Sequence, residues 1–252
     1  MWEVFVIIPA HKLNIARRLV ESDDYETAYN LLYRSGYESY DELIESLKPR
    51  YLMGAYSKAS VGSYIIFGSY EQDNIISNGK EDIEWLVLER DDDKLLVISR
   101  YALDCQKYNS STESVSWETC SLRSWLNEDF IGFAFSSNEQ SLIQSTIIMA
   151  DNNTNNETSP GNSTNDKVFL LSIKEVNEHF NSDNERQCHS TAYAKSQVTD
   201  MEEKCRWWLR SPGFLSFDAA YVNIDGVIDE DGKYANYYGI YVRPALWIDL
   251  GD

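Results

Sequence analysis

The sequence predicts an α+β protein in which a small helical segment precedes a domain of short strands and long loops. Apolar residues recur at helical spacing over residues 1–57. From residue 58 onward, β-branched and aromatic residues form short runs separated by glycine, asparagine and serine, as is typical of strands and turns. These runs do not alternate regularly with helices, so a parallel βαβ array is not expected.

The first element, residues 1–57, is predicted to be a helical hairpin segment. Its first helix carries apolar side chains at helical spacing, namely Leu13, Ala16, Leu19 and Val20. Residues 24–32, with their alanine, tyrosine and leucine side chains, resemble one helix of a tetratricopeptide-type hairpin. A single hairpin of this type buries only one face, so we expect it to pack on the following domain or on chain outside this sequence.

Capping residues indicate where these helices begin and end. The acidic pair at residues 23–24 predicts the start of the second helix, and Gly36 suits its C-terminal cap. Ser39 with Glu42 predicts a capping box for the next helix. Pro49 is expected to end that helix, because a proline inside a helix removes a hydrogen bond.

The second element, residues 58–252, is predicted to begin with strands. These strands cover residues 61–68, 83–89 and 95–99, and the aspartates at residues 91–93 are expected to join the last two as a hairpin. Short helices are predicted over residues 122–126, 137–145 and 172–180. Thr119 or Ser121 is expected near the start of the first, and Ser172 with Glu175 caps the third.

The rest of this domain is predicted to be largely irregular. Residues 151–166 carry asparagine, threonine and serine without periodicity, so we expect a long, mobile loop there. Towards the C-terminus, short strands with glycine turns are expected.

The chain is strongly acidic, with 41 acidic residues against 22 basic ones and a formal net charge of −19. Binding to phosphates needs a basic surface, so no nucleic-acid partner is expected. No stretch approaches the ~20 apolar residues of a membrane span, and residues 4–10 lack the flanks of a signal peptide. We expect a cytoplasmic protein as written, and an exported one if the chain is a fragment of a longer protein.

The four cysteines, Cys105, Cys120, Cys188 and Cys205, form no C-x-x-C pair. Only three histidines are present, at positions 11, 179 and 189, so a transition-metal site would have few ligands. Buried free thiols are therefore expected, with disulfides only in an exported protein. No metal ion or other cofactor is expected.

The C-terminal fifth contains the candidate site. Residues 207–213 (WWLRSPG) and 241–248 (YVRPALWI) are apolar enough to be buried, whereas residues 214–241 between them hold five of the chain's 17 tyrosines together with aspartates and glycines. Rigid aromatic rings beside adaptable polar groups are typical of recognition surfaces. The predicted ligand-binding residues are Phe214, Phe217, Asp218, Tyr221, Asn223, Asp225, Tyr234, Asn236, Tyr237, Tyr238 and Tyr241.

Several phrases in residues 60–250 resemble a bacterial family, the domain of unknown function DUF6273. The matching phrases occupy residues 67–72, 78–80, 83–88, 121–127, 207–213 and 242–246. The resemblance implies a C-type-lectin-like fold, similar to formylglycine-generating enzymes and to the variable proteins of diversity-generating retroelements. In such variable proteins, adenine mutagenesis diversifies a C-terminal segment, and the aromatic and aspartate residues between positions 214 and 241 could arise in that way. The alternative is that these residues are ordinary strand positions.

Evidence for catalysis is weak. The sequence has no G-x-S-x-G elbow, P-loop, H-E-x-x-H or dinucleotide fingerprint. The adjacent residues Cys188 and His189 point in different directions on a helix or strand, so a catalytic pair is not expected. Formylglycine-generating enzymes act through a C-terminal cysteine pair with copper, but no cysteine follows Trp208 and Cys205 has no partner a few residues away.

Charged residues within this region have structural interpretations. A calcium loop aligned on Gly232 would place Val227 and Tyr238 at positions that require carboxylates. Arg123, Arg210 and Arg243 lie in apolar phrases, and we expect each to form a partly buried ion pair with an acidic residue such as Glu84. The alternative is that these arginines recognise an anion. The tryptophans at positions 85, 125, 207, 208 and 247 are expected in the core.

We therefore expect a non-catalytic recognition protein that binds a protein or carbohydrate ligand through its C-terminal aromatic and acidic surface. Two alternatives remain open. One is a modifying enzyme related to formylglycine-generating enzymes. The other is an assembly module that docks through its N-terminal helices.

Overall fold

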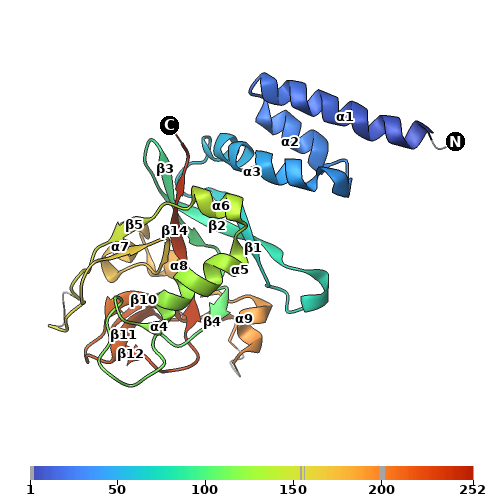
Figure 1. Cartoon of the computed structure of the whole chain (residues 1–252). Coiled ribbons are helices and arrows are strands. Elements are labelled where there is room, and N and C mark those ends of the chain that lie inside the picture. The colour runs from blue at the N-terminus through green and yellow to red at the C-terminus, as the bar shows by residue number, and fades with distance from the viewer. Residues whose placement is uncertain (1–2, 154, 156, 199–201, 252) are drawn as a thin grey trace.

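The computed structural model describes residues 3–153, 155, 157–198 and 202–251 (Figure 1). Over these residues, a helical segment at the N-terminus lies beside a domain that contains two five-stranded sheets. Two short ribbons, β5–β6 and β8–β9, complete the strand pairing of this part of the chain. The mixture of helices and largely antiparallel sheets confirms the α+β expectation. Among the helices of the described residues, none is long and apolar enough to span a bilayer.

The N-terminal segment contains α1 (Glu3–Glu21), α2 (Tyr25–Tyr33) and α3 (Asp41–Tyr56). These helices share a small hydrophobic core that is separate from the core of the following domain. The core of the helices includes Ala16, Ala28, Leu32, Ile44 and Leu47. The carboxylate of Asp24 accepts the N–H of Thr27 (3.1 Å) and caps α2, as the acidic pair predicts. The capping box expected at Ser39 is wrong, because Ser39 lies within the 3-10 turn η1 (Glu38–Tyr40) that precedes α3.

The expectation that Pro49 ends its helix is also wrong, since α3 continues to Tyr56. A proline inside a helix leaves the carbonyl four residues earlier without its N–H partner. Here that carbonyl, Glu45 O, accepts a hydrogen bond from the side-chain amide of Asn138 (2.7 Å), which belongs to α6 (Ser137–Leu142) of the neighbouring domain. Beside it, Lys48 forms an ion pair with the buried Glu139 (3.0 Å). The domain thus supplies the bond that the proline removes.

The first sheet has the order β1-β2-β3-β14-β7, and its neighbouring strands are antiparallel. Its strands are β1 (Tyr64–Tyr70), β2 (Glu81–Arg90), β3 (Lys94–Ser99), β14 (Ala245–Asp249) and β7 (Val168–Phe169). A turn at residues 91–93 joins β2 to β3, where Asp91 N–H bonds to Lys94 O (3.0 Å), so the predicted hairpin is confirmed. The strand β14, near the C-terminus, lies between β3 and β7. It therefore pairs residues 245–249 with the sheet that contains β1 to β3.

The second sheet has the order β12-β11-β10-β13-β4. Its strands are β12 (Ile228–Tyr234), β11 (Asp218–Val222), β10 (Trp207–Pro212), β13 (Tyr241–Val242) and β4 (Asp104–Cys105). Strands β10 and β13 are parallel, and the other neighbours are antiparallel. The predicted core tryptophans Trp85, Trp207 and Trp208 are completely buried, and Trp125 and Trp247 pack against the same core.

Short helices and ribbons lie in the connections between these strands. They are η2 (Ile76–Asn78), α4 (Ser121–Trp125), the π-helical turn η3 (Leu126–Phe130), α5 (Ile131–Ala134), β5 (Thr146–Ile148), β6 (Thr164–Asp166), α7 (Ile173–His179), α8 (Asp183–Arg186), β8 (Cys188–His189), α9 (Ala192–Ser196) and β9 (Lys204–Cys205). The capping box of Ser172 with Glu175 is present at α7, as predicted. Helix α4 begins at Ser121, as expected, and the Cys120 sulfur caps it by accepting Arg123 N–H (3.4 Å).

The loop predicted at residues 151–166 is anchored at several points instead of projecting freely. Its last residues form β6, which pairs with β5. The buried side-chain amide of Asn153 donates to Pro212 O (2.9 Å) and Glu230 O (2.8 Å). The Thr158 hydroxyl donates to Phe214 O (2.7 Å). A polar sequence without periodicity therefore lies along the second sheet, because its side chains bond to the backbone of that sheet.

We predict that Asn138→Ala lowers the free energy of unfolding by about 1–2 kcal/mol, because it leaves the partly buried Glu45 carbonyl without a donor. In a Pro49→Ala background, residue 49 regains its N–H and the same substitution is expected to cost less. Urea unfolding of the four proteins of this double-mutant cycle measures the coupling. Equal costs in the two backgrounds would show that the Asn138–Glu45 bond does not compensate for Pro49.

Candidate functional site

The candidate site is built on a fully buried frame formed by β10 and β11, in which every residue is buried. The chain turns after β10 at Gly213, whose N–H bonds to Asp218 O (2.9 Å). A Cβ atom at Gly213 would lie 2.4 Å from Asp231 O, so only glycine fits where β12 passes this turn. The next residue, Phe214, donates its N–H to the same Asp231 carbonyl (2.7 Å). The turn that presents Phe214 is therefore held to β12 by its backbone.

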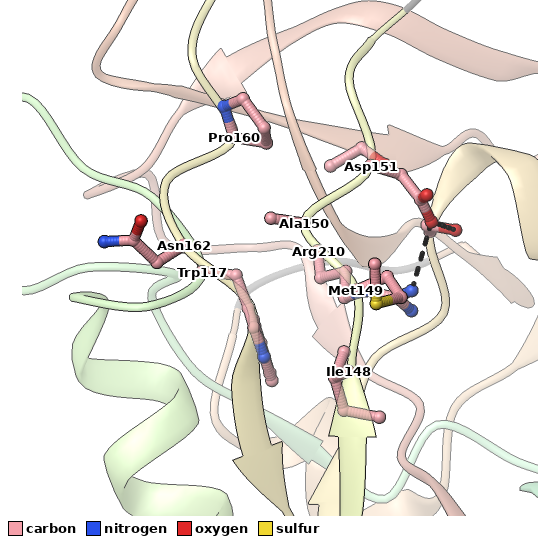
Figure 2. A pocket seen from close by; sticks show the side chains of 10 residues that line it. Trp117, Ile148, Met149, Ala150, Asp151, Pro160, Asn162 and Arg210 are labelled. Atoms are coloured by element: carbon pink, nitrogen blue, oxygen red, sulfur yellow. Dashed lines mark hydrogen bonds and ion pairs between the residues drawn. The ribbon is translucent and has the colours of Figure 1, made fainter.

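Arg210 connects this frame to the rest of the domain. Its guanidinium donates to Glu175 (2.8 Å), to Asp151 (3.4 Å) and to the carbonyl of Leu170 (2.9 Å). The side chain is buried, and its ion pairs confirm the predicted structural role of this arginine. Figure 2 shows the contact with Asp151 beside a small cavity under the 149–163 loop. Because that cavity has a volume of only about 10 Å³, it has room for about one water molecule and is not a ligand site.

The other two arginines differ from each other. Arg123 pairs with the buried Asp166 (2.7 Å), as predicted. Arg243 is buried, but no carboxylate of the described residues lies within 4.0 Å of it. Glu84 forms its ion pair with Arg100 instead (2.8 Å). The expectation of a buried ion pair is therefore wrong for Arg243.

The exposed rings of the candidate segment are Phe214 (61%), Tyr234 (55%), Tyr238 (46%) and Tyr237 (40%). The half-buried ring of Phe217 packs against Tyr234, with ring centroids 5.7 Å apart. We call these five residues the aromatic surface. They lie in the turn after β10, at the end of β12 and in the segment between β12 and β13. In Figure 1, strands β10 to β12 lie at the opposite end of the molecule from α1 to α3.

Three predicted ligand-binding residues are buried and cannot contact a ligand at the surface. Tyr241 lies in β13, where it is opposite Cys105 of β4. Asp218 is covered by the Gly213 turn, and burial raises the pKa of its carboxyl group. Tyr221 packs edge-on against Trp208, and its hydroxyl donates to Asp229 (2.7 Å). Burial, together with Asp229, raises the pKa of Tyr221 to about 12. These residues support the surface from below.

The predicted polar residues have different local roles. Asn223 closes the tight turn between β11 and β12, where its N–H bonds to Val227 O (2.8 Å), and its side chain accepts Arg206 Nε–H (3.1 Å). Asp225 is exposed in that turn, and its carboxylate accepts Val227 N–H (3.1 Å). Asn236 is half-buried in the segment beside Tyr237. Of these residues, Asp225 leaves the most surface for a ligand.

Acidic side chains lie along the edge strand β12, whose last residue is Tyr234 of the aromatic surface. A shallow cavity of about 370 Å³ is lined there by Asn155, Asn223, Val227, Ile228, Asp229, Glu230 and Asp231. Lys233 places its ammonium group over the ring of Tyr237, 5.3 Å from the centroid. Asp229 and Lys233 are not among the ligand-binding residues predicted from the sequence. Their alternation with Ile228, Glu230 and Tyr234 along β12 is the signal that could have identified them.

One group of carboxylates in the described chain has the spacing of a metal site. It consists of Glu71, Asp73 and Glu81, whose ligand atoms lie within 4.8 Å of one another. These carboxylates accept backbone N–H groups of the loop after β1, including those of Gln72 (2.7 Å) and Ile75 (2.9 Å). Their arrangement is therefore explained by the capping of that loop.

The family model for the domain of unknown function DUF6273 matches residues 92–250. This match covers more than half of the chain and includes the frame and the aromatic surface. It begins after β2, so the phrases at residues 67–88 lie outside it. No curated protein and no solved structure matches the chain.

We predict that Gly226→Ala destabilises this site by about 2–4 kcal/mol. Gly226 has a φ of +87°, and a Cβ atom there would lie 1.7 Å from Asp183 O. The substitution would also displace the Gly226 carbonyl, which accepts Arg186 Nε–H (2.9 Å). Gly54→Ala in α3 is the matched control. It meets no atom within 4 Å and is expected to stabilise by about 0.5–1 kcal/mol. Thermal unfolding of both variants measures the difference, and equal effects would contradict a strained, close-packed turn.

Proposed function

This chain belongs to the DUF6273 family, and we propose that its family domain is a non-enzymatic recognition module that binds a protein or carbohydrate ligand through the aromatic surface. The observation that carries the proposal is the contrast between frame and turns. Every residue of β10 and β11 is buried, whereas Phe214, Tyr234, Tyr237 and Tyr238 remain 40–61% exposed.

Exposed rings do not contribute the hydrophobic stabilisation that buried rings contribute. Their presence next to a buried frame therefore favours a role in binding. Aromatic side chains contribute a large contact area. They have few rotatable bonds, so they lose little conformational entropy when a ligand binds. The acidic groups along β12, which include Asp229 and Asp231, favour a ligand that presents basic or hydroxyl groups. The two sheets with long, anchored loops support a C-type-lectin-like fold as part of this proposal.

Replacing Tyr237 and Tyr238 together with alanine is expected to weaken ligand binding by roughly 10–30-fold. Because both rings are exposed, the free energy of unfolding is expected to change by less than about 1 kcal/mol per site. The matched control is Phe133→Ala, which removes an exposed ring (55%) from α5. A glycan array and a displayed peptide library provide the probes.

Binders that are lost with the tyrosine pair and retained with Phe133→Ala would support the aromatic surface. Binders that tolerate the double substitution, or that are lost equally with the control, would contradict it. A large fall in the melting temperature of the double variant would instead assign these tyrosines to the core.

If the family domain is a variable protein of a diversity-generating retroelement, variation is expected at the exposed residues Phe214, Tyr234, Tyr237 and Tyr238. It is not expected at Tyr221 and Tyr241, whose rings are buried. Sequencing the adjoining DNA for a reverse transcriptase gene and a near-copy of these codons checks this expectation. A near-copy that differs mainly at the codons of buried residues would contradict it.

A further inference from the structure

A second site lies away from the aromatic surface, where β8 and β9 pair. In this antiparallel ribbon, Cys188 is directly opposite Cys205. Opposite residues in antiparallel strands have Cα atoms about 4.5–5.5 Å apart, which is within the range of about 4.4–6.8 Å that a disulfide spans. Both cysteines are buried thiols. The pairing brings together two sulfurs that are well separated in the sequence.

Arg243 places a positive charge next to this pair. Its Nε–H donates to Ser99 O (2.9 Å), and its guanidinium lies over the rings of Trp207 (5.0 Å) and Phe180 (5.7 Å). Its Nη1 atom is buried and has no hydrogen-bond partner among the described residues. A buried guanidinium without a carboxylate requires another source of negative charge. The thiolate form of Cys188 can supply that charge.

A cavity of about 460 Å³ reaches Cys188. Besides Cys188, the charged and titratable side chains of its lining are Tyr64, Arg100, Tyr101, Glu185, His189 and Arg243. His189 does not form a pair with Cys188, since its Nδ1 donates to Glu203 O (3.1 Å) on the β9 side. Cys188 lines this cavity, whereas Cys205 is not among its lining residues. A small molecule in this cavity therefore meets Cys188 before Cys205.

The two thiols differ in acidity. Burial alone would raise the pKa of Cys188, but its hydrogen bond with Cys205 and the charge of Arg243 outweigh burial and lower this pKa to about 7. Burial and the neighbouring Cys188 raise the pKa of Cys205 well above its usual value. Cys120 is a useful comparison, because burial raises its pKa to about 12. Thiolates are the reactive form of cysteine, so Cys188 is the thiol prepared for reaction.

We propose that Cys188 and Cys205 form a reversible oxidation site for small hydroperoxides, in which the cavity admits the peroxide to Cys188 and Cys205 closes a disulfide across the β8–β9 ribbon. The proposal is independent of the aromatic surface, because it requires no ligand there.

The chemistry balances in two steps. The Cys188 thiolate attacks one oxygen of the hydroperoxide, the O–O bond breaks, and the sulfur becomes a sulfenic acid while the leaving oxygen takes a proton. The sulfur of Cys205 then attacks the sulfenic sulfur, the S–O bond breaks, and the hydroxyl group leaves as water with the Cys205 proton. With hydrogen peroxide, two thiols and one peroxide give one disulfide and two waters.

The disulfide would close the chain segment that contains α9. This helix already contacts β4 through Gln197, whose amide donates to Asp104 (3.0 Å), and its Tyr193 N–H bonds to Gln72 O (3.0 Å). Cross-linking the two ends of the segment reduces the freedom of the unfolded chain. Oxidation is therefore expected to raise the melting temperature by about 5–10 °C.

The test uses the full chain, reduced and then treated with hydrogen peroxide. The remaining thiols are alkylated, and the digested protein is analysed by mass spectrometry without reductant. We expect the peptides that contain Cys188 and Cys205 to be joined, with a mass lower by two hydrogen atoms, and to separate on reduction. The rate of this reaction is expected to rise with pH through a midpoint of about 7, as the Cys188 thiolate forms.

Two variants make the assignment specific. In Cys205→Ser, the sulfenic acid of Cys188 cannot be resolved, so dimedone is expected to label Cys188. Cys120→Ser is the matched control, because serine also caps α4 and the Cys188–Cys205 link should form unchanged.

Three results would overturn the proposal: no link between Cys188 and Cys205, a link that involves Cys105 instead, or modification of Cys188 no faster than that of Cys120. The first and third are read from the wild-type chain alone, so the conclusion does not depend on whether a variant folds.

Discussion

The buried guanidinium of Arg210 is the contact on which the arrangement of the two sheets depends. Arg210 belongs to β10 in the second sheet, while its partner carbonyl, Leu170 O, directly follows β7 in the first. Glu175 at the start of α7 and Asp151 in the long loop supply the negative charge. Loss of one partner from a buried ion pair typically costs about 3–5 kcal/mol, since a buried charge is left behind. This single side chain therefore positions a helix, a loop and two sheets.

The exposed rings depend on this frame. Phe214 follows the Gly213 turn at the end of β10, and its carbonyl accepts the Thr158 hydroxyl of the loop that Asp151 anchors. A recognition surface needs solvent-facing side chains on a rigid backbone. Each mobile group that becomes ordered on binding loses conformational entropy, and this loss reduces affinity. Here backbone hydrogen bonds join the β10 turn to β12, and side chains of the loop bond to the backbone of both. The rings remain exposed for contact. Rigidity and exposure come from different parts of the same segment.

Two buried arginines in the domain illustrate how position determines chemistry. Arg210 has carboxylate partners and is structural, whereas Arg243 has aromatic rings, one carbonyl and a neighbouring thiol. A guanidinium without a carboxylate favours negative charge on a neighbouring group that can ionise, and its charge lowers the pKa of Cys188. The compensation at Pro49 follows a related rule, because Asn138 of the domain completes a hydrogen bond that the helix lacks. In both cases, a polar group that lacks its usual partner, the Arg243 guanidinium or the Glu45 carbonyl, is stabilised by a residue far away in the sequence.

The amino-acid sequence by itself determined the features that depend on a few neighbouring residues. The α+β class, the Asp24 and Ser172 caps, the β2–β3 hairpin and the buried tryptophans follow from local spacing and polarity. Local patterns also identified the segment of the aromatic surface, but they did not distinguish exposed Tyr237 from buried Tyr241. Only the tertiary structure decided which rings face solvent, which strands place Cys188 opposite Cys205, and which arginine lacks a carboxylate. These outcomes depend on strand order and register, which bring together residues that are far apart in the chain. The pattern of neighbouring residues does not indicate such contacts.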